Sequence, residues 1–222
     1  MEFSGPQPAD YANVRSLNIA FLRCLRGVAT GVRMREVLPD SAATTVLGLG
    51  EGEIVRLAEM PLLLVSVREY DDGYWQALLD SEPTRDLLKP RAETPVVAQV
   101  AAAVLGFLWQ LARHNPYATR LVSGATPDWC RRITACTLPS LLWRALEEDE
   151  LLRPRFATEA GVWERLLGPG LSPMPEVRNA AQISVLQRLL TNFPDPARMR
   201  RRAAACRSAV PSVSVAEAHR RD

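Results

Sequence analysis

Apolar residues recur at three- and four-residue steps along two long stretches of the chain. The first stripe consists of Leu17, Phe21, Cys24, Leu25 and Val28. The second consists of Val104, Phe107, Leu108, Leu111 and Ala112. This spacing is typical of helices that bury one face. Only residues 62–67 read as a strand, and their length fits a short buried helix as well. The pattern predicts an all-α fold.

The two stripes open two similar series of segments, which indicates an internal duplication. Each series ends on one tryptophan and two leucines, in residues 75–79 and 163–167. The offset between matching segments changes only from about 86 to about 88 residues along the series. We expect two tandem helical units, residues 1–82 and 96–168. A proline-containing linker, residues 83–95, joins them.

Residues 169–222 follow the second unit and are predicted to hold a C-terminal helix and an arginine-rich tail. The helix, residues 176–192, has apolar residues that fit one face, and it either packs on the units or reaches a second molecule. These residues are Val177, Ala180, Ala181, Ile183, Val185, Leu186, Leu189 and Leu190. The last dozen residues are expected to be disordered.

The net charge of +2 gives no overall attraction to nucleic acid, so local clusters of charge matter more. One cluster lies in the tail and contains Arg198, Arg200, Arg201, Arg202 and Arg207. Guanidinium groups suit phosphate oxygens, so the cluster is a candidate DNA-binding segment. The alternative is a solvated tail without a ligand.

The chain lacks a recognisable catalytic constellation, which argues against an enzyme and against a small-molecule substrate or cofactor. Its two histidines, His114 and His219, are not convincing bases. Residues 48–52, Gly-Leu-Gly-Glu-Gly, lack the Lys-Ser/Thr of a phosphate-binding loop and are interpreted as a turn between short helices. The five tryptophans fit core packing better than base stacking.

Composition places the protein in the cytoplasm and away from membranes. The four cysteines include no pair with CxxC spacing, so most of them are expected to be small buried residues, with no disulfide framework or metal site. Charged residues interrupt each apolar stretch before it reaches the length of a membrane span. The first six residues do not resemble a secretory signal.

Residues 42–59, Ala-Ala-Thr-Thr-Val-Leu-Gly-Leu-Gly-Glu-Gly-Glu-Ile-Val-Arg-Leu-Ala-Glu, resemble FlhD, the flagellar master-regulator subunit. The similarity extends to Leu-Asn-Ile-Ala-Phe-Leu at 17–22 and Arg-Glu-Tyr-Asp-Asp at 68–72. The second unit shows the same outline at its turns, in residues 123–128, 135–140 and 153–156. The resemblance covers about residues 14–80 and 100–168, and it leaves the C-terminal extension without a counterpart.

The resemblance implies an all-helical dimerisation fold that activates transcription with a DNA-binding partner, FlhC. Family members form intertwined dimers, so two copies on one chain would form an intramolecular pseudo-dimer. The family's protomer-linking cysteine corresponds to Ser66 and to a position near Leu152, and a fused pair would not need that bridge. Arg35 and Arg120 correspond to a family arginine, which makes them candidates for a partner- or promoter-facing surface. The family's zinc cluster belongs to the partner.

Two functions follow as hypotheses. The first is an FlhD-like transcriptional activator subunit that helps an FlhC-like partner hold promoter DNA and RNA polymerase. It would control motility or the transfer of a mobile element. The alternative is a helical adaptor or assembly protein that does not bind DNA.

Overall fold

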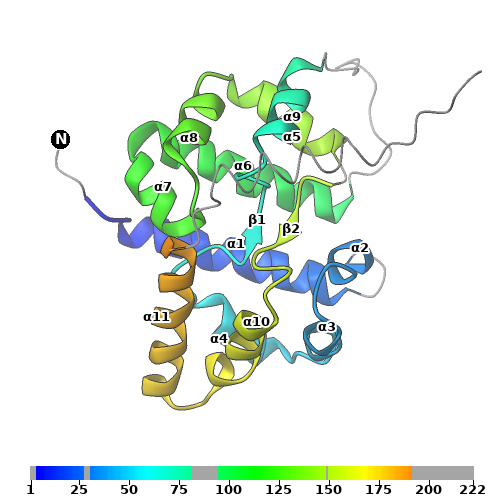
Figure 1. The fold of residues 1–222 in the computed structure, drawn as a ribbon, viewed down its shortest axis with the longest axis vertical. Helices are drawn as coiled ribbons and strands as arrows, with labels where there is room; N and C mark the ends of the chain where they lie inside the picture. The colour runs from blue at the N-terminus through cyan, green and yellow to red at the C-terminus, as the bar shows by residue number, and fades with distance from the viewer. Residues whose placement is uncertain (1–3, 28–30, 82–94, 149, 192–222) are drawn as a thin grey trace, which may run out of the picture. The chain divides into compact units, whose positions relative to one another are not determined.

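The computed structural model describes residues 4–27, 31–81, 95–148 and 150–191, and these residues are mostly helical, as predicted. The first half contains α1 (Pro8–Arg26), α2 (Val32–Arg35), α3 (Asp40–Leu47), α4 (Glu51–Ala58), β1 (Val65–Ser66) and α5 (Asp72–Asp80). The second half contains α6 (Val96–His114), α7 (Pro116–Ser123), α8 (Pro127–Thr134), α9 (Leu138–Glu147), β2 (Arg153–Pro154) and α10 (Ala160–Leu167). A 3-10 helix, η1 (Pro169–Leu171), and α11 (Pro175–Thr191) follow (Figure 1).

The same order of elements therefore occurs twice along the chain: four helices, a short strand and one more helix. The starts of α1 and α6, of β1 and β2, and of α5 and α10 are each 88 residues apart. The starts of α3 and α8, and of α4 and α9, are each 87 residues apart. The starts of α2 and α7 are the exception, at 84 residues apart, so the offset stays at 87 or 88 residues for five of the six matching elements. A nearly constant offset is the pattern expected of a repeat.

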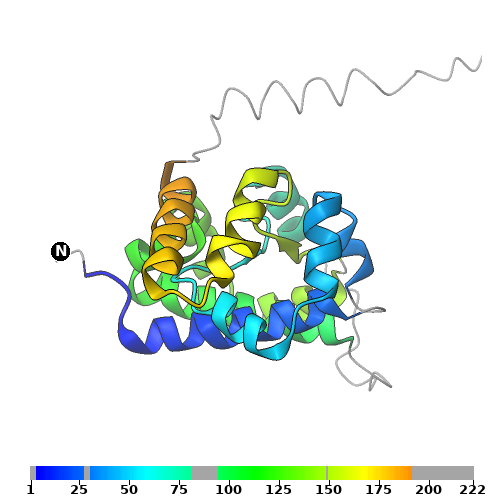
Figure 2. The same cartoon turned by 90° about the horizontal axis from the view of Figure 1, so that it is seen from below.

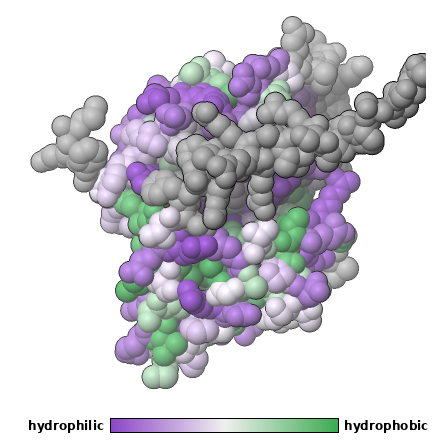
Figure 3. All heavy atoms as spheres, viewed as in Figure 1, coloured by the Kyte–Doolittle hydropathy of each residue, from purple (hydrophilic) through white to green (hydrophobic). Residues whose placement is uncertain are grey.

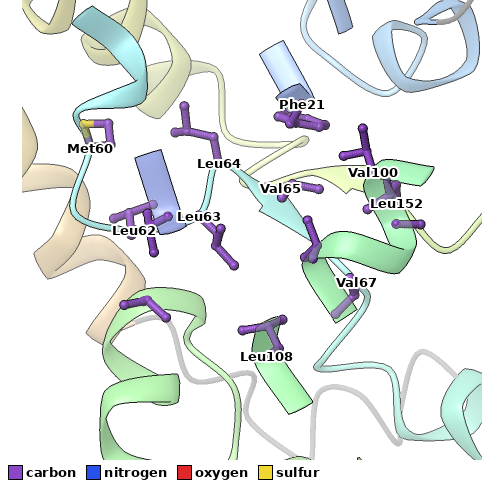
Figure 4. Close-up of a cluster of buried hydrophobic side chains, with 14 of the residues drawn as sticks. Phe21, Met60, Leu62, Leu63, Leu64, Val65, Val67, Val100, Leu108 and Leu152 are labelled. Atoms are coloured by element: carbon purple, nitrogen blue, oxygen red, sulfur yellow. The ribbon is translucent and has the colours of Figure 1, made fainter. Parts of the chain in front are cut away.

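The extended segment before α5 forms the centre of the core. Strand β1 pairs with β2 in antiparallel register, with Val65 opposite Pro154 and Ser66 opposite Arg153. The strand prediction for residues 62–67 is therefore right for Val65–Ser66, and the helix alternative is wrong. Figure 4 shows Leu62, Leu63, Leu64 and Val65 among side chains from α1 and α6. These four residues are fully buried.

A buried asparagine attaches this segment to α1. The Asn18 side chain donates a hydrogen bond to the Leu62 carbonyl (2.9 Å) and accepts one from the Leu64 amide (2.8 Å). Buried backbone groups are costly when unpaired, and the amide side chain satisfies a donor and an acceptor at once. Asn18 thus fixes where the chain crosses α1.

The last helix of each half packs on the other half. Trp75 of α5 meets Trp129 of α8 edge to face, with ring centroids 5.4 Å apart. Arg144 of α9 donates to the Leu79 carbonyl at the end of α5 (3.1 Å). In the reverse direction α10 packs against α3, and the long helices α1 and α6 also pack together (Figure 2). Helices of each half therefore contact the other half within one compact unit that ends at Thr191.

Helix α6 is the one helix in the described part of the chain that is long and apolar enough to cross a membrane. The expectation that charged residues interrupt every apolar stretch before that length is therefore wrong for this helix. It packs against α9 and α1, and eight of its residues are buried. These include Val104, Leu105 and Leu108, which are fully buried. Its apolar character therefore has an explanation within the core, since a central helix of a globular protein passes the same test.

Helix α11 packs on η1 and α10, and its Gln182 side chain donates to the Glu59 carbonyl of the first half (3.5 Å). Its buried residues Ala181, Val185 and Leu189 are spaced four apart and so lie along one side of the helix. The predicted apolar face is wrong for three residues, because Val177, Ala180 and Ile183 are exposed. A stripe that runs from Val177 to Leu190 is wider than the side of the helix that the two halves cover.

Candidate functional site

A buried ion pair joins the two halves at their centre. Arg155 comes directly after β2, and Glu69 comes shortly before α5. The guanidinium of Arg155 pairs with the carboxylate of Glu69. Arg155 is 4% exposed and Glu69 is 1% exposed. An ion pair this deep is favourable only where further hydrogen bonds satisfy the remaining polar atoms.

The structure supplies those bonds. Arg155 donates to the carbonyls of Leu63 (2.6 Å), Val65 (2.7 Å) and Ser123 (2.5 Å). The other Glu69 oxygen accepts from the Ser66 hydroxyl (2.7 Å) and from the Val67 amide (3.0 Å). Because these polar groups are saturated and buried, the pair serves to join the halves rather than to react with a substrate.

The turns on either side of this pair match each other at a distance of 88 residues. Arg68 and Phe156 are the two non-glycine residues with positive φ in the described part of the chain, at 59° and 57°. The indole of Trp75 donates to the Val67 carbonyl, and that of Trp163 donates to the Arg155 carbonyl, both at 3.1 Å. Two equal hydrogen bonds and two equally rare backbone conformations show that the two halves share local geometry.

The predicted partner-facing arginines lie apart in the structure. Arg35 of α2 donates to the carbonyls of Leu25 and Gly27 (2.7 Å to the latter), at the end of α1. Arg120 belongs to α7, on the opposite side of the view in Figure 1. Both side chains are half-buried. Arg35 therefore helps to close the end of α1, and the two arginines do not form one patch.

The predicted DNA-binding arginines, Arg198, Arg200, Arg201, Arg202 and Arg207, lie outside the described residues. The described surface mixes charges of both signs. Hydrophilic and hydrophobic residues are interspersed over the face seen in Figure 3. Several exposed arginines pair with acids, as Arg131 does with Asp128 and Arg23 does with Glu51. Such pairs reduce the positive charge that these arginines could offer to phosphate.

Two half-buried tyrosines and two buried cysteines serve packing. The Tyr70 hydroxyl donates to the Gly124 carbonyl (2.7 Å), and burial raises its pKa to about 12. Burial likewise raises the pKa of Tyr74 to about 12 and that of Cys130 to about 11. Each of these groups stays protonated at neutral pH, so none of them is an activated nucleophile or base. Cys24 is also buried, which confirms the expected role of these two cysteines.

Three of the five tryptophans are fully buried, as the core interpretation predicts. They are Trp75, Trp129 and Trp163, and none of them is available to stack on a base. Residues 48–50 connect α3 and α4, so the turn predicted over residues 48–52 is right for these three residues and wrong for Glu51 and Gly52, which begin α4. Glu51 follows that turn, and hydrogen bonds from Arg23 and Arg26 hold its pKa below the usual range. An acid at this place is unsuited to a phosphate-binding loop.

One shallow hollow of about 380 Å³ lies between α1 and the connection from α4 to β1. It is lined by Tyr11, Ala12, Arg15, Glu59, Met60 and Pro61. The described residues contain no group of three His, Cys, Asp or Glu side chains that could hold a metal ion. The hollow combines one cation and one anion with an apolar floor, and it lacks the paired catalytic groups that a reaction would need.

The sequence alone does not identify Arg155 and Glu69 as a pair. The signal available was an arginine beside a proline and an aromatic residue, at the end of an apolar stretch. Their partnership depends on a fold that brings together residues 86 positions apart. Compared with models of known protein families, with curated proteins and with solved structures, the chain shows no match.

Proposed function

We propose that this chain is an FlhD-like subunit of a transcriptional activator, in which two fused copies form an intramolecular pseudo-dimer. The observation that carries the proposal is the exchange of last helices, with α5 packed on the second half and α10 on the first. An exchange of identical elements between protomers is the hallmark of an intertwined dimer. Two such protomers joined in one chain would produce this arrangement.

The position of Ser66 supports the same proposal. The resemblance places the family's protomer-linking cysteine at Ser66 and near Leu152. In the structure Ser66 pairs with Arg153, directly after Leu152, at the strand pairing between the halves. A family link between protomers would therefore coincide with the place where the two halves meet. Because the chain itself already joins the halves, a disulfide there would add little.

The proposed activity is to help an FlhC-like partner hold promoter DNA and RNA polymerase. The described surface has no dominant cationic face, so we assign most DNA contact to the partner and to residues 198–207 of this chain. Arg120 stays a candidate for the partner-facing surface. Arg35 is a weaker candidate, since its guanidinium already binds the end of α1.

The pairing of exposed arginines with acids favours one rival, a helical adaptor that does not bind DNA. Arg188 with Glu159 is a further example, and the half-buried Arg132 pairs with Asp72. The rival and the activator share the same intertwined fold. They differ in whether a complex of this chain with its partner retains DNA.

A gel shift on promoter DNA at about 50 and 200 mM salt, with and without an FlhC-like partner, distinguishes them. We expect retention only with the partner, and weaker retention at the higher salt because phosphate contacts release counterions. A chain that ends at residue 195 is expected to lose affinity and to show a shallower salt dependence. No retention under any condition would refute the activator. Unchanged affinity after truncation would reduce the arginine cluster to a solvated tail.

A further inference from the structure

Helix α11 is attached to the rest of the fold through few buried side chains. Three of its 17 residues, Ala181, Val185 and Leu189, are buried, whereas eight of the 19 residues of α6 are buried. Val177 and Ile183, which the sequence pattern places inside, are 37% and 58% exposed. Because packing is stabilised mainly by the apolar surface that it removes from water, α11 is held less firmly than the central helix.

The polar contacts between α11 and its neighbours lie at water-accessible positions. Arg188 pairs with Glu159, the N-cap residue of α10, through side chains that are 46% and 22% exposed. Arg165 of α10 donates to the Ser184 hydroxyl (3.1 Å), and Gln182 donates to a carbonyl at the end of α4 (3.5 Å). Exposed contacts of this kind add little to stability, since water replaces them at small cost.

The buried side of α11 rests on the α7–α8 turn. A Cβ built on Gly124 would lie 2.8 Å from the Cδ1 atom of Leu189, so this leucine contacts the turn backbone directly. Two hydrogen bonds hold Gly124 without α11: its amide donates to the Arg120 carbonyl, and its carbonyl accepts from the Tyr70 hydroxyl, both at 2.7 Å. The turn therefore keeps its bonds when α11 moves away.

We propose that α11 is a detachable strap, which opens as one unit while the two halves stay folded. The seat that it leaves, the Gly124 turn and the start of α10, then binds an amphipathic helix of a partner protein. The strap itself specifies this occupant: apolar residues at steps of four, with an arginine directly before the last of them. Helices docked on a surface are recognised through such spaced anchors. The inference goes beyond the proposed function, because it holds for an activator and for an adaptor alike.

Hydrogen exchange of the full chain, followed by mass spectrometry, tests the opening. We expect the amides of α11 to exchange at least about tenfold faster than the slowest amides of α6, because a weakly packed element opens locally. Leu189→Ala should accelerate exchange in α11 at least about tenfold further and leave α6 unchanged, since it removes an anchor of the strap alone.

Ile183→Ala is the matched control for the exchange measurement. It removes as many carbon atoms from the same helix at an exposed position, so it should change exchange in α11 about twofold or less. Unchanged exchange of α6 also shows that each variant stays folded. Equal exchange of α11 and α6 in the native chain, or equal acceleration of both by Leu189→Ala, would overturn the strap.

A labelled peptide of residues 173–191 probes the seat, with binding to the full chain followed by fluorescence anisotropy. Because α11 must open first, Leu189→Ala in the protein should raise the peptide affinity by about the factor by which it accelerates exchange in α11. Ile183→Ala should leave the affinity unchanged. Absent binding, or equal affinity in all three chains, would overturn the seat. Dimers of the Leu189→Ala chain in sedimentation would show that a second copy takes the seat, and would overturn its assignment to a partner.

Discussion

Arg155→Leu is expected to lower the free energy of unfolding by about 3–5 kcal/mol, the range for breaking a buried ion pair from one side. The change leaves the Glu69 carboxylate buried without its cation. It also leaves the carbonyls of Leu63, Val65 and Ser123 without this donor. Because domains are stable by only about 5–15 kcal/mol, we expect a large loss of folded protein. Chemical denaturation followed by far-UV circular dichroism measures it.

Glu69→Gln should cost less, about 1–3 kcal/mol, because the amide keeps the size of the side chain and one acceptor oxygen. Arg155 then still has its three carbonyl partners. Asp128→Asn is the matched control, since it changes an ion pair of α8 in which both side chains are more than 70% exposed. Exposed pairs contribute at most about 1 kcal/mol. If Arg155→Leu lowers the free energy of unfolding by no more than about 1 kcal/mol, the result contradicts the structural role assigned to the buried pair.

Trp75→Ala and Trp163→Ala are expected to have similar effects, each lowering the free energy of unfolding by about 3–5 kcal/mol. Both indoles are fully buried and donate to equivalent carbonyls, 88 residues apart. Each also belongs to a helix that packs on the other half. The similarity of the two losses tests whether the halves are equivalent in energy as well as in geometry. Denaturant unfolding of the two variants provides the comparison.

Trp143→Ala serves as the control for these two variants because Trp143 is only half-buried on α9. Its expected loss is smaller, since less apolar surface leaves water on folding. If the protein tolerates alanine at Trp75 but unfolds with alanine at Trp163, or the reverse, the two halves are not equivalent. A loss for Trp143 as large as that for Trp75 would show that removing any tryptophan has this effect.

The elements with a clear apolar period were the predictable ones. The stripes through Phe21 and Leu108 correspond to α1 and α6, and the two Trp-Leu-Leu segments correspond to α5 and α10. In each case one helix face is buried, so the spacing of apolar residues along the sequence predicts which residues are buried. The extended residues around Val65 were ambiguous because a short apolar run fits a strand or a helix.

The packing of α5 on the second half could not be predicted from residues alone. An apolar face on α5 shows that the helix is buried, but it does not show which half supplies the surface. Trp129 is that surface, and it lies in the other half. Arg155 was missed for a related reason, since arginine is usually exposed and its partner Glu69 is distant in sequence.

Helix α11 shows the opposite error. The apolar spacing in this helix predicts more buried residues than the neighbouring helices cover. Ile183, one of the predicted residues, is 58% exposed. Its inner side, with Val185 and Leu189, does match the pattern. A stripe of apolar residues therefore locates a helix more reliably than it defines the width of the buried face.

Producing the two halves as separate chains, residues 1–81 and 95–222, tests the pseudo-dimer most directly. Because α5 contacts Trp129 of the second half and α10 packs on α3 of the first, each half alone would expose a surface that the other half covers in the intact chain. We predict that neither half unfolds cooperatively alone, and that mixing them yields a 1:1 complex with the far-UV circular dichroism and tryptophan fluorescence of the intact chain. Two halves that each unfold cooperatively as monomers, and that do not associate, would contradict the account.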